Sequence, residues 1–302
     1  MGDNVPASKR KALASRLRKG LRKFSSLLSI LASGDDPKTV HQARVRSRRL
    51  QQHLGVLFPK PRPRKVRKLR RELRRVRRAL GEWRNYDVLL ALVAREERRT
   101  RGRTTSRTWE VVREYISGRR DREIERARRK LRKYTPEQFS MPALKSRQRP
   151  SGKQDTEASM RPLRISLEEG WSEWHSAFKK ADESRDANSI HAFRLATKRL
   201  RYRVELLCDL GDAASKPWLA SLKKWQSQLG VWHDRQALRQ LIAEALARPE
   251  FLLREPQTAR ALLSLLEKSG SRQSAELDWI FPRVRESIEA ESSDGTERPS
   301  AV

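Results

Sequence analysis

The chain has 302 residues, with 69 Lys or Arg against 37 Asp or Glu, which gives a formal net charge of +32 at pH 7. This excess of one sign goes beyond what solubility requires and indicates a polyanionic partner: nucleic acid, an anionic membrane surface or a phosphate polymer. Eight tryptophans exclude a purely disordered polycation, and the single cysteine, Cys208, excludes an intramolecular disulfide.

Residues 7–135 form the first predicted unit, in which apolar residues recur at the three- and four-residue spacing of amphipathic helices. Asp36 followed by Pro37 predicts a helix start, because Asp is a favoured N-cap and Pro a favoured first helical residue. The Arg- and Thr-rich residues 98–107 predict a loop. No sustained alternation of apolar and polar residues indicates a strand, so we expect an all-α fold.

Residues 136–160 are predicted to be a linker, because they contain three prolines and no clear apolar stripe. A second helical unit is expected over residues 161–291, with Gly211 ending one of its helices. The polar residues 292–302 are expected to be a disordered tail. No apolar run approaches the roughly 18 residues of a membrane span, and the lack of paired cysteines favours cytoplasmic residence.

The two units contain an internal repeat. Residues 41–50 and 191–200 both fit the pattern H-x-x-R-x-x-[ST]-[KR]-R-L, at an offset of 150. About 40 residues later, residues 80–85 and 229–234 share Leu-Gly-x-x-x-[DN] at an offset of 149. Two motifs at nearly one offset indicate a gene duplication and two similar bundles. Here Gly81 and Gly230 predict breaks between helices, with Asn85 and Asp234 as capping residues of the helices that follow.

On a helix, each copy of the first motif places its cations on one face. At 100° per residue, His41, Arg44 and Arg48 fall within about 60° of one another, with apolar residues on the opposite side. The second copy behaves in the same way; its cationic face consists of His191, Arg194, Lys198 and Arg201. The sequence therefore predicts two helices that are anchored by one face and present a row of cations on the other.

The segment that follows the first motif is more basic still. Eleven basic residues and one acid, Glu72, lie between Arg62 and Arg78. Like charges four residues apart destabilise a helix, so we interpret this segment as part of a polyanion site. The 149 offset matches its Arg74 and Arg75 with Lys223 and Lys224 of the second unit. By contrast, acidic residues interleave with the basic run from Arg113 to Lys133, which we interpret as a solvated face.

These paired motifs resemble those of the CHAD (conserved histidine α-helical domain) family, over about residues 7–288. The resemblance implies two pseudo-symmetric four-helix-type bundles around a central basic channel, and binding of inorganic polyphosphate. It also implies association with polyphosphate granules or with polyphosphate-metabolising enzymes. Some members carry a triphosphate tunnel domain ahead of the helices; its Glu-x-Glu-x-Lys signature is absent, so we expect the helical module alone.

The family's motif also implies which residues contact phosphate. They are His41, Arg44, Arg48 and Arg49 in the first half, His191, Arg194, Lys198, Arg199 and Arg201 in the second, and Arg74, Arg75, Lys223 and Lys224 in the segments that follow. One departure is Asn85, where the family commonly has Asp. Another is that Gln51, Gln52 and His53 stand where the second copy has Arg201, Tyr202 and Arg203, which predicts unequal halves of the channel.

Three alternatives remain open from the residues alone. Nucleic-acid binding fits the charge, but the basic faces contain few of the aromatic residues that stack on bases, so we expect only non-specific binding. An enzyme or metal protein is disfavoured, because none of the five histidines has a ligand partner on its own helix. We therefore expect no metal, no cofactor and no catalytic residues. A membrane-surface protein ranks last, since the apolar stripes are needed for packing within the bundle.

Overall fold

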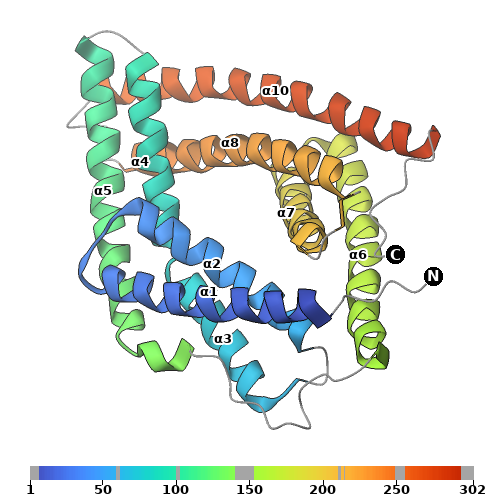
Figure 1. Ribbon diagram of the computed structural model, residues 1–302. Coiled ribbons are helices and arrows are strands. Elements are labelled where there is room, and N and C mark those ends of the chain that lie inside the picture. The colour runs from blue at the N-terminus through green and yellow to red at the C-terminus, as the bar shows by residue number, and fades with distance from the viewer. Residues whose placement is uncertain are drawn as a thin grey trace.

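The computed structural model describes residues 7–58, 62–99, 103–139, 153–209, 212, 213, 215–248 and 256–293. All regular elements in these ranges are helices, which confirms the predicted all-α fold (Figure 1). The first half contains α1 (Ala7–Ser33), α2 (Pro37–Leu57), α3 (Arg64–Ala79), α4 (Gly81–Arg99), α5 (Arg103–Leu131) and the 3-10 helix η1 (Pro136–Phe139). The second half contains α6 (Lys153–Ser184), α7 (Ala187–Asp209), α8 (Lys216–Leu246) and α10 (Pro256–Ser293).

The helices that carry the first motif begin in the same way in both halves. The carboxylate of Asp36 accepts hydrogen bonds from the backbone N–H groups of Lys38 (3.2 Å) and Thr39 (2.9 Å), so the predicted N-cap of α2 is confirmed. Asp186, 150 residues later, accepts from the backbone N–H groups of Asn188 (2.8 Å) and Ser189 (3.0 Å). The same capping chemistry therefore starts α2 and α7.

The two halves differ in the helices that follow. A turn at Leu80 separates α3 from α4, whereas α8 continues without a break through Gly230 (Figure 1). The prediction of a helix start at Gly230, with Asp234 as its cap, is therefore wrong. A glycine inside a helix costs only about 1 kcal/mol relative to Ala, and burial of Leu229 and Trp232 on either side outweighs that cost. Asn85 also lies inside α4 rather than at its cap.

The helices extend into several segments that the sequence predicted to be connections. The residues expected to form a loop at 98–107 are helical except for 100–102, which lie outside the described residues. Within the expected linker, residues 136–139 form η1 and α6 already begins at Lys153, while residues 140–152 lie outside the described ranges. Helix α10 extends to Ser293, so two residues of the expected tail are helical, and residues 294–302 lie outside the described ranges. Gly211, the expected end of a helix in the second half, also lies outside the described ranges. Turn-forming composition alone thus overestimated the length of the connections.

The hydrophobic core joins the two halves. One cluster of buried residues runs through α1, α2 and α3 of the first half and α6, α7 and α8 of the second. A second cluster packs α4 and α5 against α8 and α10, for example Val93 and Ile116 with Ile242 and Leu262. Figure 1 shows these two pairs meeting at one corner of the molecule. No described helix is long and apolar enough to cross a bilayer.

Candidate functional site

A cavity of about 750 Å³ lies between α2, α3, α6 and α7. No carboxylate belongs to its wall among the described residues, whereas basic side chains from both halves converge on it. These are Arg48, Arg62, Arg70, Arg74, Arg77, Lys198, Arg199 and Arg203. The wall therefore concentrates positive charge with nothing of opposite sign on its lining.

The hydroxyl residue of each first motif points away from the cations and anchors the helix. Ser47 is buried, and its Oγ donates to the backbone oxygen of Leu73 on α3 at 2.7 Å. Thr197 Oγ1 donates to the backbone oxygen of Phe193 at 2.9 Å and accepts from Trp174 Nε1 at 3.0 Å. The alternation predicted from the sequence, with one face anchored and one cationic, is thus confirmed in both halves.

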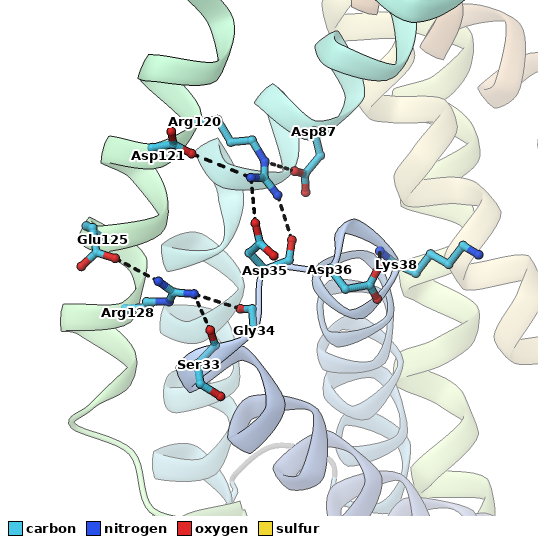
Figure 2. A network of polar contacts seen from close by, with 10 residues as sticks. All are labelled: Ser33, Gly34, Asp35, Asp36, Lys38, Asp87, Arg120, Asp121, Glu125 and Arg128. Atoms are coloured by element: carbon cyan, nitrogen blue, oxygen red, sulfur yellow. Dashed lines mark hydrogen bonds and ion pairs between the residues drawn. The ribbon is translucent and has the colours of Figure 1, made fainter.

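A network of ion pairs fixes the loop that leads into α2 (Figure 2). The guanidinium of Arg120 on α5 donates to Asp87 on α4 at 2.7 Å and to both the side chain (3.1 Å) and the backbone oxygen (2.8 Å) of Asp35. Arg128, two turns further along α5, donates to the backbone oxygen of Ser33 at 2.7 Å. The Asp87 carboxylate is fully buried. The contacts of Arg120 with Asp87 and Asp35, which we call the Arg120 clamp, therefore hold the segment before α2 against α4 and α5.

Arg48 on α2 and Tyr202 on α7 form a contact between the two halves at the cavity wall. The Arg48 guanidinium lies 4.4 Å from the centroid of the Tyr202 ring and donates to its hydroxyl. Arg201 lies 3.9 Å from the centroid of the same ring. The one aromatic side chain on the wall is therefore already in contact with cations.

The first residues of both motifs lie beside the cavity, where His41 is electrostatically coupled to Arg48 and His191 to Lys198. The guanidinium of Arg44 donates to the backbone oxygen of Arg77 at 2.9 Å. The rings of His191 and His233 have centroids 5.1 Å apart. The buried Nε of Arg194 has no hydrogen-bond partner among the described residues. An anion reaching this end of the cavity would find donors that the protein itself leaves unused.

Burial and repulsion between neighbouring cations lower the pKa values of several basic groups at the site. Burial, together with Arg48 and Arg194, lowers the pKa of Lys198 from 10.5 to about 7. Burial and the charge of Arg48 lower the pKa of Arg44 to about 10, and burial with Arg194 lowers that of His233 to about 4. The pKa values of His41 and His191 are also lowered, mainly by burial. An anion in the cavity would oppose all of these shifts.

The structure brings nine of the thirteen residues predicted as phosphate contacts together. Arg48, Arg74, Lys198 and Arg199 line the cavity. Five more lie close enough to be electrostatically coupled to Arg48 or Lys198: His41, Arg44, His191, Arg194 and Arg201.

The remaining four predicted contacts are placed elsewhere. Arg49 pairs with Glu205 at 2.8 Å and Arg75 with Glu72 at 3.3 Å. Lys223 and Lys224 are exposed on α8, which does not line the cavity, and Lys224 lies 5.1 Å from the Trp279 ring centroid.

Sequence reasoning did not single out four arginines of the wall: Arg62, Arg70, Arg77 and Arg203. Arg70, Arg74 and Arg77 follow one another at spacings of four and three residues, which places them on one face of a helix. This spacing could have predicted Arg70 and Arg77 as contacts once Arg74 was chosen. The comparison of the two repeats favoured Arg74 and Arg75 instead. Arg203 could not be found in this way, because its guanidinium uses the space left by the missing side chain of Gly170 on another helix.

Two comparisons place the chain among known proteins. The model of the CHAD domain family matches residues 13–243. The crystal structure of the CHAD domain from the plant Ricinus communis is similar in fold, with a TM-score of 0.56 and 22% sequence identity. That match covers 93% of this chain and 92% of the plant chain. No curated protein matches this chain significantly.

Proposed function

The chain belongs to the CHAD domain family, and on this premise we propose that it binds inorganic polyphosphate in the cavity between α2, α3, α6 and α7. One observation carries the proposal: eight basic side chains line the cavity, and the described wall contains no carboxylate. Like charges gathered on one wall repel one another, and among the described residues only Arg199 of these eight has an acidic partner, Glu173. A polyanion that enters the cavity supplies the missing counter-charge, which makes the arrangement favourable.

The chemistry of the wall suits a phosphate chain. Linear polyphosphate offers closely spaced anionic oxygens and has no bases to read or to stack upon. Seven of the eight basic wall residues are arginines, whose forked N–H donors match pairs of phosphate oxygens, while Lys198 acts as a point charge. Arg62 Nε, a buried donor of a wall residue without a partner among the described residues, is a group expected to gain from bound phosphate.

Nucleic acid fits this cavity less well. Proteins that bind single strands combine a basic groove with free aromatic faces. Here Tyr202 is the one aromatic residue on the described wall, and Arg48 and Arg201 already lie against its ring. We therefore include nucleic acid in the proposal only as a non-specific, weaker ligand.

The proposal contains no catalytic step. Phosphoryl transfer normally uses carboxylates to hold magnesium near the reacting phosphate. The described wall of the cavity has none, and the described residues contain no group of three side chains arranged to hold a metal. A binding module of this kind would act at polyphosphate granules in the cytoplasm or beside a polyphosphate-metabolising enzyme.

Calorimetric titration with polyphosphate of defined length tests the proposal. Arg48→Gln/Lys198→Gln removes two cavity cations, and each charged hydrogen bond contributes about 1.5–3 kcal/mol. We expect at least about 100-fold weaker binding. The matched control, Lys179→Gln/Lys180→Gln, removes two exposed cations of α6 and should bind like wild type. Equal weakening in both variants would mean that net charge, not the cavity, holds the ligand.

A further inference from the structure

Helix α3 is cationic on a second side that does not face the cavity. Its apolar residues form one stripe, and the cavity arginines flank that stripe. Six further cations lie within about 60° of the direction opposite the stripe, and all six are exposed. They are Arg64, Arg67, Lys68, Arg71, Arg75 and Arg78. Figure 1 shows α3 at the lower edge of the molecule. We call this set the outer face of α3.

The outer face has almost no acidic residues to offset its charge. Arg75 pairs with Glu72, which is buried, and Glu72 is the only acid in α3. Several of the other cations stand three or four residues apart, for example Arg67 and Arg71, where like charges destabilise a helix. A face with this composition weakens α3 unless an external anion compensates the repulsion.

The fold itself does not require these cations. The equivalent segment at the 149 offset, residues 213–227, follows the second motif helix in the chain and includes the first turns of α8. Four of the six cations have uncharged counterparts there. Arg64, Lys68, Arg71 and Arg78 correspond to Ala213, Pro217, Ala220 and Ser227. The positive outer face is thus particular to the first half.

We propose that the outer face of α3 is a second subsite, to which a long polyphosphate chain continues after it leaves the cavity. This inference rests on the proposed function of the cavity. Arg74 connects the two regions, because it lines the cavity and is itself exposed. The chain would pass from Arg70 and Arg77 over Arg74 to the outer face.

The occupant is a phosphate chain rather than a nucleic acid because α3 contains no aromatic residue. Binding of single-stranded nucleic acid depends on stacking of bases as well as on charge. The outer face offers only guanidinium and ammonium groups, which recognise phosphate oxygens. A polymer that consists of phosphate alone satisfies this surface without leaving bases unaccommodated.

The test compares two chain lengths on one variant. A short chain of about eight residues, one charge for each cation of the wall, engages the cavity alone; a long chain has about 100 residues. Arg64→Gln/Lys68→Gln/Arg71→Gln/Arg78→Gln keeps good helix formers in α3 and leaves every cavity residue unchanged. The matched control is Lys179→Gln/Lys180→Gln/Arg260→Gln/Lys268→Gln, which removes the same charge from exposed positions on α6 and α10.

We expect the outer-face variant to bind the short chain like wild type and to bind the long chain at least about tenfold more weakly. The slope of log K against log salt for the long chain should fall by about 0.7 for each phosphate that the variant no longer binds. The control variant should change neither affinity by more than about twofold. Failure of wild type to bind the short chain would instead contradict the cavity proposal, so the two failures are distinguishable.

Three results would overturn the second subsite. The first is unchanged long-chain affinity in the outer-face variant. The second is an equal loss of affinity for both chain lengths, which would reflect the overall field. The third is binding of two short chains by wild type and of only one by the variant, because the outer face would then bind a separate chain and not the continuation of the chain in the cavity. Loss of single-stranded RNA binding with long-chain polyphosphate affinity retained would assign the face to nucleic acid.

Discussion

The side chain of Gln52 donates a hydrogen bond of 2.9 Å to the backbone oxygen of Tyr202, and the two residues are 150 positions apart, at equivalent places in the two halves. In a two-fold arrangement, a residue on the axis meets its own counterpart. The contact between Gln52 and Tyr202 is the kind that such an arrangement of the two predicted halves would give, and both residues line the cavity. The cavity thus lies where α2 and α7, the helices that carry the two sequence motifs, meet, and the different side chains at this point make its two sides unequal.

The charged side chain of Lys198 is predicted to lower the stability of the ligand-free protein, although it contributes to polyphosphate binding. Its pKa of about 7 in the folded chain, against 10.5 normally, means that the unfolded chain holds the proton more tightly. Stability therefore rises with pH between these values. Lys198→Met should stabilise the ligand-free protein by about 1 kcal/mol at pH 6, and the gain should fade towards pH 10.5. Chemical denaturation at several pH values measures this. A destabilised variant at pH 6 would contradict the assignment.

Polyphosphate affinity is predicted to fall as pH rises above about 7. Burial and the cations Arg48, Arg194, Arg44 and Arg201 lower the pKa of Lys198 to about 7 in the free protein. Bound phosphate raises that pKa, so binding takes up a proton and weakens by up to about tenfold per pH unit. The fall ends at the pKa of the bound state. Lys198→Arg should abolish most of this dependence, because Arg stays charged. Titration in buffers of different ionisation enthalpy reports the proton uptake.

The Arg120 clamp is predicted to be structural rather than ligand-binding. Asp87→Ala removes a fully buried partner of Arg120 and should cost about 3 kcal/mol of unfolding free energy. Asp121→Ala removes a partner that is 73% exposed and 3.9 Å away, and should cost less than about 0.5 kcal/mol. Urea denaturation of both variants checks the difference. Equal costs would show that the buried pair does not hold the α1–α2 loop.

Competition is predicted to separate polyphosphate from nucleic acid. Single-stranded RNA carries a similar density of charge, but its bases would find no free aromatic face on the described cavity wall. At equal phosphate concentration and fixed salt, long-chain polyphosphate should therefore displace labelled RNA, and RNA should fail to displace polyphosphate. Displacement of polyphosphate by RNA would make nucleic acid the better candidate ligand.

Local periodicity was sufficient to predict the helices and the cationic faces of α2 and α7. The spacing of His41, Arg44 and Arg48 determines which way these side chains point, and the structure confirms it. Capping by Asp36 was likewise readable, because the cap is a contact between near neighbours in the chain. These features depend on residues within two turns of one another.

Features that depend on packing between distant segments could not be predicted in the same way. Gly230 resembles Gly81 in its motif, but neighbouring buried residues keep α8 continuous. Arg201 belongs to the cationic face by its helical angle, yet Gln226 and Glu205 engage it. Arg203 reaches the wall because Gly170 leaves room for it. In each case the outcome is decided by a partner that lies on another helix or on a later turn.

A structure of the protein with a short polyphosphate chain tests the central claim most directly. We expect phosphate density inside the cavity, with oxygens about 2.7–2.9 Å from the nitrogen atoms of Arg48, Arg70 and Lys198, the length of charge-assisted hydrogen bonds. We also expect the guanidinium of Arg203, which lines the cavity, to donate to that chain. A chain bound on another surface, with the cavity left to solvent, would contradict the account.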